Sequence, residues 1–181
     1  PSGAADGFPG SLFIMAHDRI AYGELPDGNQ VAEVSIPAPM MGAAVNSLNS
    51  GEFLQDFSEV ARGAFTELEE IPRVGMAYLN HALTVFFFHL TWGAHLQDSS
   101  QPSQAWFNPD LTQGDLTGFW FLDELDPYSV TGYLFEIPQA WAKAYSGGRV
   151  LASGRYRDGG QGGMGPSLYA YTPWQPDGSP E

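Results

Sequence analysis

Three carboxylates stand where acid–base chemistry is expected. Asp18 closes a predicted strand, and Glu136 interrupts an apolar one. Asp158 follows Arg155 and Arg157, whose positive charges are expected to keep it ionised. Two such carboxyl groups can act together as general acid and general base. The alternative is structural: Asp18 lies in a turn, Glu136 faces solvent on an edge strand, and Asp158 caps a glycine loop.

A denser acidic cluster precedes Pro127 and consists of Asp123, Glu124 and Asp126. Calcium takes about six to eight oxygen ligands, and acidic loops of this kind supply them. The sequence contains no D-x-D-x-D-G loop, so we expect a solvated acidic turn. The alternative is a calcium site with these three residues as its ligands.

Aromatic residues are expected on two polar, proline-containing loops. Trp106 and Phe107 lie in the stretch 95–118, and Trp174 lies in the sequence TPWQP near the C-terminus. Exposed aromatic rings are common platforms for sugar rings and for protein partners. These three residues are therefore the candidate ligand-binding residues, and ordinary packing against the scaffold is the alternative.

Common catalytic and cofactor motifs are missing from the sequence. The chain has no cysteine, which excludes disulfides, thiolate nucleophiles and cysteine-ligated metals. The glycines of GGQGGMG fit the G-x-G-x-x-G spacing of dinucleotide sites, but those sites need a helix next. Here Pro166 and the alternating residues 168–171 predict a strand. We therefore expect a flexible glycine-rich turn at residues 159–165.

The charge of the chain limits its partners. It carries 21 acidic and 7 basic residues, which gives a net charge of -14 at pH 7. Nucleic acid and anionic lipid surfaces require clustered Lys and Arg, so neither is an expected partner. The longest apolar run, residues 83–90, is far shorter than the ~20 residues that cross a bilayer, so membrane insertion is not expected. An acidic, cysteine-free chain suits an extracellular or periplasmic location.

The elements that must position these residues are predicted to be mostly strands. Residues 1–181 have the length and hydrophobic content of a single folded domain, and 22 glycines and 14 prolines divide it into short segments. Alternating or apolar stretches predict strands at residues 11–17, 30–36, 73–79, 83–92, 119–122, 133–137, 149–157 and 168–171.

Pairing and helices follow from the same patterns. Residues 73–79 and 83–92 are expected to form a hairpin whose second strand, apolar on both faces, is central. Residues 119–122 and 133–137 are expected to form another pair. Pro138 is expected to begin a short helix that ends at Tyr145. The three- and four-residue apolar spacing in residues 52–68 favours an amphipathic helix, with a strand followed by an irregular loop as the alternative.

Two parts of the sequence resemble a known family. The stretch GYLFEIPQAWAKAY, followed by GRVLASGRYRDGG and GPSLYAYTPW, resembles blades of bacterial glycosidase-like β-propeller proteins of uncharacterised function. GSLFIMAHD and QVAEVSIP are similar to the opening blade of those proteins. The resemblance implies chemistry that uses two carboxyl groups about 5 to 9 Å apart, for which Asp18, Glu136 and Asp158 are the candidates.

The strand count bears on both fold and function. About eight strands would build two or three blades, whereas a closed propeller has at least about four. We therefore expect a mainly β protein with antiparallel sheets, as a partial propeller or a β-sandwich, with one or two short helices. Unfinished sheet edges predict another protein chain or self-association. The expected function is a non-catalytic interaction or structural module of an extracellular or cell-envelope assembly. The alternative is a carbohydrate-active, glycosidase-like propeller enzyme.

Overall fold

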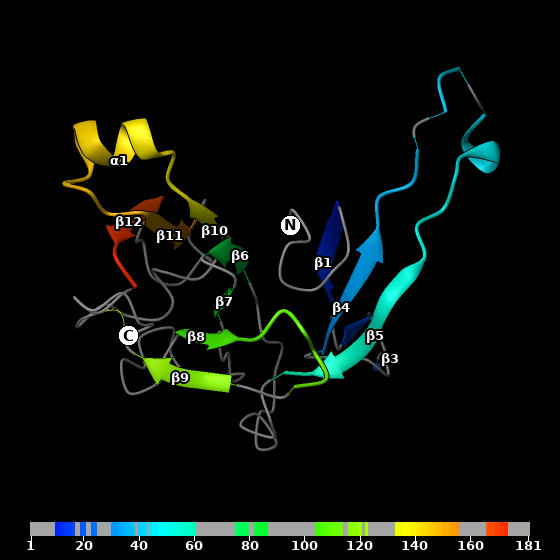
Figure 1. Cartoon of the computed structure of the whole chain (residues 1–181), viewed down its shortest axis with the longest axis horizontal. Helices are drawn as coiled ribbons and strands as arrows, with labels where there is room; N and C mark the ends of the chain where they lie inside the picture. Colours follow the sequence, from blue (N-terminus) through cyan, green and yellow to red (C-terminus); the bar gives the residue numbers. More distant parts are fainter. Residues whose placement is uncertain are drawn as a thin grey trace.

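The computed structural model describes the chain in the following ranges: 10–16, 19–20, 23–24, 30–38, 40–42, 44–60, 75–79, 82–86, 104–113, 116–120, 122, 133–155 and 166–173. These residues form twelve β-strands, one α-helix and one short 3-10 helix, and all strand pairs among them are antiparallel (Figure 1). The expectation of a mainly β protein with antiparallel sheets is confirmed. Within the described ranges, no helix has the length and apolar character that crossing a membrane requires.

The N-terminal sheet has three strands, with β4 (Gln30–Ser35) between β1 (Ser11–Met15) and β5 (Phe53–Glu59). Valines and alternating side chains suit β4 to this inner position, because its residues pack on both sides of the pleat. The pairing of β4 with β5 shifts register at two points, which marks a bulge. A separate two-stranded ribbon pairs β2 (Arg19–Ile20) with β3 (Gly23–Glu24).

The central sheet is a meander of four consecutive strands: β6 (Gly75–Leu79), β7 (Ala82–Phe86), β8 (Gln104–Phe107) and β9 (Leu116–Trp120). The predicted hairpin is confirmed, since β6 and β7 pair from Gly75 and Phe86 to Leu79 and Ala82. The inner position of its second strand is also confirmed, because β7 lies between β6 and β8.

The C-terminal sheet has the order β10 (Tyr133–Glu136), β11 (Leu151–Arg155) and β12 (Ser167–Tyr171). The helix α1 (Gln139–Tyr145) joins β10 to β11, as predicted from Pro138, which is its N-cap residue. The helix ends where Gly147 and Gly148 take positive φ angles of 64° and 86°, a conformation that glycine adopts without steric cost.

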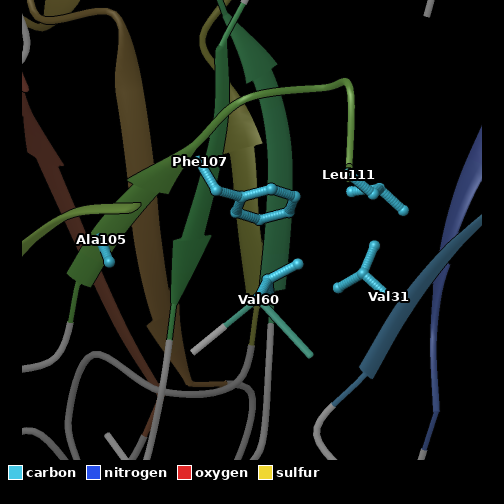
Figure 2. Packing of buried hydrophobic residues seen from close by; sticks show 5 residues of the cluster. All are labelled: Val31, Val60, Ala105, Phe107 and Leu111. Carbon is cyan, nitrogen blue, oxygen red and sulfur yellow. The ribbon is translucent and has the colours of Figure 1, made fainter. Parts of the chain in front are cut away.

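The first hydrophobic core lies between the N-terminal and central sheets. In Figure 2, the side chains of Val31, Val60, Phe107 and Leu111 converge in the space between β4 and the central sheet. The buried members are Val31, Val60, Ala105, Phe107 and Leu111, and the half-buried Phe13, Met15, Met76 and Tyr78 pack against them.

The second core lies on the other side of the central sheet. Its buried members are Ala77, Leu79, Trp106, Leu134 and Leu151, with Leu122, Tyr169 and Tyr171 packed against them. Successive residues of β6 and β8 therefore alternate between the two cores, as the two-residue period of a strand requires. The central sheet is the middle of three layers, with the N-terminal sheet on one face and the C-terminal sheet on the other (Figure 1).

Gly75 sets how closely the central and C-terminal sheets approach. A Cβ atom at this position would lie 2.6 Å from the Cβ and 2.9 Å from the backbone nitrogen of Leu134. Both distances are shorter than non-bonded heavy atoms can approach. The strands β6 and β10 therefore pack at a separation that only glycine permits.

Three sequence expectations about the elements are wrong, and the first is the loop expected at 95–118, which contains β8 and the beginning of β9. Residues 53–59 form β5 rather than the first half of a helix. The pairing of β5 with β4 contains a bulge, and an inserted residue breaks the two-residue alternation of a strand. This explains why the apolar spacing favoured a helix. The alternative of a strand is confirmed for these residues, and 61–70 lie outside the described ranges. The predicted pairing of 119–122 with 133–137 also fails, since β9 pairs with β8 and β10 pairs with β11.

Candidate functional site

Of the three predicted catalytic carboxylates, the structure describes Glu136. It is exposed at the end of β10, next to the exposed Phe135. Asp18 and Asp158 lie outside the described residues, as does the glycine-rich stretch 159–165. The distance between carboxyl groups on which the glycosidase expectation depends is therefore a prediction still to be measured.

Trp106 and Phe107 do not form an exposed aromatic platform. They belong to β8 rather than to a loop, and their side chains are only 2% and 4% exposed. Trp106 points into the second core and Phe107 into the first, so neither ring is open to a ligand. The prediction that they bind a ligand from a loop is wrong, because the polar residues around them conceal a four-residue buried strand. Trp174 lies outside the described residues.

The predicted calcium ligands Asp123, Glu124 and Asp126 also lie outside the described residues. In the part of the chain that is described, no group of three or more His, Asp or Glu side chains is placed to hold a metal ion. The calcium site remains a prediction from the sequence.

One carboxylate that the sequence did not single out is buried in the N-terminal sheet. Glu33 on β4 has no exposed surface. The hydroxyl of Ser11 on β1 donates to Glu33 Oε1, and Gln55 Nε2 on β5 donates to Glu33 Oε2 at 2.6 Å. Both neighbouring strands therefore supply donors to the carboxyl group, which is the usual condition for burying one.

The amide of Gln55 extends this network to the central sheet. Its Nε2 also donates to the backbone oxygen of Pro109 at 2.8 Å, and its Oε1 accepts from the backbone nitrogen of Leu111 at 2.8 Å. These bonds fix the loop that follows β8 and place Leu111 in the first core. Because Glu33 has no access to solvent, this network holds two sheets together rather than presenting a reactive group.

The same loop contains an exposed carboxylate with a local role. Asp110 accepts hydrogen bonds from the Thr112 hydroxyl at 2.6 Å, the Gln113 side chain at 2.8 Å and the Thr112 backbone nitrogen at 3.0 Å. These bonds, first that of the Thr112 hydroxyl, hold the pKa of Asp110 below its usual value. The arrangement is an Asx turn that shapes the loop.

The most distinctive surface feature is an arm, residues 36–51, that joins β4 to β5. Figure 1 shows it projecting away from the three sheets, with the 3-10 helix η1 (Val45–Ser47) at its far end. The arm contains no charged residue, although the chain as a whole has a net charge of -14. A long uncharged segment in so acidic a chain was the sequence signal that could have drawn attention to it.

Large hydrophobic side chains are exposed along the arm. Met41 and Val45 are 94% and 87% exposed, which is close to the exposure of an extended peptide. The other exposed members are Ile36, Met40 and Leu48. Soluble proteins rarely gather such side chains without a partner surface, so the arm is the strongest candidate interaction site in the described part of the chain.

Hydrogen bonds define the base of the arm. Ser35 donates its backbone N–H to Glu52 O at 2.9 Å, and the Glu52 backbone N–H donates to Ser35 Oγ at 2.9 Å. Further out, Asn49 Nδ2 donates to Ala38 O at 2.8 Å. Between Ala38 and Asn49, the hydrogen bonds of the described residues all lie within the turn of η1. The arm is thus fixed where it leaves the sheet and presents its tip outward.

A second exposed group lies on α1. Trp141 and Tyr145, one helical turn apart, are both exposed, and their ring centroids are 4.6 Å apart. Lys143, the single lysine of the sequence, is exposed on the same helix. The sequence predicted this helix but not that its aromatic residues would face solvent.

Comparison with known proteins adds no relative, since no family model, curated sequence or solved structure matches the chain. The functional argument therefore depends on the geometry of the chain itself, in which the arm is the clearest element.

Proposed function

We propose that this chain is a non-catalytic interaction or structural module of an extracellular or cell-envelope assembly. The observation that carries the proposal is the exposed apolar arm, residues 36–51, with Met41 and Val45 at its tip. Burying such side chains against a partner is favourable by about 1.5–3 kcal/mol for each fully buried residue, which gives the arm a binding role without any catalytic group.

The charge distribution supports the same proposal. A net charge of -14 keeps the body of the protein soluble and disfavours nucleic acid and anionic membranes as partners. The arm contains no charged residue, unlike the rest of the chain, so we expect the contact of highest affinity at the arm. An extracellular or envelope location is proposed from the acidic, cysteine-free composition.

For the architecture, we propose that the three layers are propeller-like blades, with a β-sandwich as the alternative. The supporting observation is that the central sheet is a meander of four antiparallel strands in sequence order, which is the strand order of a propeller blade. The three strands of the C-terminal sheet also follow sequence order. A partner would then cover sheet edges that the chain leaves open.

Photo-crosslinking tests the interaction proposal. A photoreactive amino acid replaces Met41 in the organism that encodes the chain, and a matched control places it at Leu168, which is exposed on β12. We expect a covalent adduct with protein of the extracellular medium or the envelope from position 41 and little from position 168. Absence of an adduct from position 41, or equal adducts from both positions, would contradict the proposal.

A carbohydrate-active function is the second proposal, and one observation favours it. Exposed Glu136 lies close in sequence to the exposed rings of Trp141 and Tyr145, which contact each other at an inclined angle, and aromatic rings are common platforms for sugars. A hydrolysis screen on oligosaccharides, followed by Glu136→Gln, Asp18→Asn and Asp158→Asn in any activity found, tests it. Glu52→Gln, an exposed carboxylate elsewhere, is the control. Activity that survives all three substitutions would exclude these residues.

A further inference from the structure

We propose that Met41, at the tip of the arm, is a site of reversible oxidation by peroxides, and that its sulfoxide changes the arm from an apolar to a polar contact surface. The effect on binding rests on the proposed interaction function, whereas the choice of Met41 as the oxidised residue does not. The inference follows from the sulfur content of the sequence and from the exposure of the arm.

Methionine is the only sulfur-containing residue type of the chain. The sequence has five methionines and no cysteine, so an oxidant that reacts with sulfur meets thioethers alone. The structure describes Met15, Met40, Met41 and Met76, and Met164 lies outside the described residues. The described methionines form two pairs with different surroundings.

Met40 and Met41 are adjacent on the arm, and both are exposed. Met41 is 94% exposed and Met40 is 42% exposed. The next residue, Gly42, has a φ of 73°, and in the described part of the chain a Cβ atom added there would meet no heavy atom within 4 Å. The arm itself projects away from the sheets (Figure 1). The Met41 thioether is therefore open to a dissolved oxidant.

Met15 and Met76 belong to the body of the fold. Met15 is the last residue of β1 and Met76 lies on β6, and both are half-buried and pack against the first core. Strand pairing fixes their backbone, with Met15 opposite Val31 and Met76 opposite Val85. An oxidant reaches these thioethers less freely than it reaches Met41, so we expect them to react later.

The reaction transfers one oxygen atom to the Met41 sulfur. A lone pair of the sulfur attacks one oxygen of hydrogen peroxide, the O–O bond breaks, and the other oxygen leaves as hydroxide. The hydroxide takes the proton of the transferred oxygen, which gives the sulfoxide and one water molecule. The sulfur loses two electrons and the peroxide gains them. Surrounding water assists the proton transfer, which also favours an exposed thioether over one that packs against a core.

The charge of the chain does not exclude this oxidant. Hydrogen peroxide is neutral, so a net charge of -14 does not repel it, whereas the same charge repels anionic oxidants. Hydrogen peroxide is therefore the oxidant that we use as the probe.

Oxidation makes the tip of the arm polar. A thioether is apolar and flexible, whereas a sulfoxide is polar and its oxygen accepts hydrogen bonds. A partner that buries Met41 together with Val45 must then bury this oxygen without a donor, which we expect to weaken binding by about 10-fold or more. Methionine sulfoxide reductases oxidise a pair of thiols, release water and restore the thioether, so the change is reversible.

Peptide mapping by mass spectrometry tests the choice of residue. The folded chain is treated with hydrogen peroxide, samples are quenched with catalase over time, and fragmentation distinguishes Met41 from Met40. We expect a gain of one oxygen, about 16 Da, at Met41 first, about 5-fold or more faster than at Met15 and Met76. The same treatment in urea is the control, because unfolding exposes all these thioethers and should bring their rates within about 2-fold. Equal rates in the folded chain would overturn the proposal.

Retention on a hydrophobic-interaction column tests the change of surface without any partner. Oxidation of Met41 should make the wild-type chain elute earlier, and a methionine sulfoxide reductase with dithiothreitol should restore the original retention. Met41→Leu keeps an apolar side chain without sulfur, so peroxide should leave its retention unchanged. Met41→Gln should elute early without peroxide. If oxidation of Met41 left wild-type retention unchanged, the proposed change of surface would be wrong.

A photoreactive amino acid at Val45, which is 87% exposed, connects oxidation to the proposed interaction function. We expect the yield of protein adducts to fall by about 10-fold after peroxide treatment, and to stay constant when Met41→Leu is also present. Equal yields before and after oxidation would overturn the effect on binding. Absence of adducts in both states would contradict the interaction function and its regulation together, and the peptide map would still decide whether Met41 is the oxidation site.

Discussion

Gln55 Nε2 lies 2.6 Å from Glu33 Oε2, on neighbouring strands of the N-terminal sheet, and the carboxyl group that it contacts has no exposed surface. The same amide contacts the backbone at Pro109 and Leu111. One side chain therefore satisfies a buried carboxylate and fixes the loop that closes the first core. The sheet that carries the arm is joined to the central sheet through this contact.

Replacing Gln55 by Leu should destabilise the protein strongly. The substitution leaves the Glu33 carboxyl with one donor fewer and removes the partners of the Pro109 carbonyl and the Leu111 N–H. Losing hydrogen bonds to buried polar and charged groups costs about 3 kcal/mol or more in unfolding free energy. Urea denaturation measures the loss. Gln139→Leu is the control, because Gln139 is exposed on α1, and its effect should stay within about 0.5 kcal/mol. Equal effects of the two substitutions would show that the network does not stabilise the fold.

Two glycines should respond to alanine for different reasons. Gly75→Ala places a methyl group 2.6 Å from Leu134 Cβ, so β6 and β10 must separate, and we expect a loss of about 2–3 kcal/mol in unfolding free energy. Gly148 has a φ of 86° and no heavy atom within 4 Å of an added Cβ, so Gly148→Ala should cost only the backbone strain, about 1 kcal/mol. Thermal unfolding of both variants compares them. A larger loss of unfolding free energy for Gly148→Ala than for Gly75→Ala would mean that β6 and β10 are far enough apart at Gly75 to accept a methyl group.

The sequence predicted the strands whose side chains alternate regularly and missed those whose pattern is disturbed. β1, β4, β11 and β12 lie where alternation placed them. β5 was predicted as a helix because a bulge breaks its period, and β8 was predicted as a loop because four buried residues are too short a run to stand out from polar neighbours. Missing β8 also led to the wrong partner for β9.

The site was harder to predict than the strands because it depends on what lies across from each residue. Alternation does not show which strands flank β4, and so does not reveal that Glu33 meets Ser11 and Gln55. The sequence predicts exposed rings at Trp106 and Phe107, but their burial depends on the two neighbouring sheets, which the sequence around them does not specify. The uncharged arm was visible in the composition, but its projection from the fold was not.

The Asx turn at Asp110 should depend on pH in the acidic range. Hydrogen bonds from Thr112 and Gln113 lower the pKa of Asp110 below the ordinary aspartate value of 3.8, so the stabilisation is fully present above that value. It is lost as the pH falls through the lowered pKa of the folded state, because protonation removes an acceptor. Carboxyl-carbon NMR should give a titration midpoint for Asp110 below 3.8, and Thr112→Val should raise it. A midpoint unaffected by that substitution would contradict the role of the Thr112 hydroxyl.

Tyr171 is at the centre of a buried polar group between the central and C-terminal sheets. In the described part of the chain, three buried polar atoms have no hydrogen-bond partner: Tyr171 OH, Gln104 Nε2 and Ser153 Oγ. Burial raises the pKa of Tyr171 well above 10.0, and the neighbouring Gln104 and Ser153, which lack hydrogen-bonding geometry to its hydroxyl, offset that rise only in part. At neutral pH, Tyr171→Phe should therefore be neutral or stabilising, because it removes a hydroxyl that burial deprives of water.

Above the ordinary tyrosine pKa, the same substitution should become clearly stabilising relative to wild type. The unfolded state loses the Tyr171 proton near pH 10.0, whereas the folded state retains it, so the wild type loses stability as the pH rises beyond that value. Between about pH 9 and pH 11 the difference in unfolding free energy between Tyr171→Phe and wild type should grow by about 1 kcal/mol. Urea denaturation at both pH values measures it, with Tyr145→Phe, which removes an exposed hydroxyl, as the matched control. A difference that stays constant would mean that the Tyr171 hydroxyl ionises equally in both states, and hence that water reaches it between the two sheets.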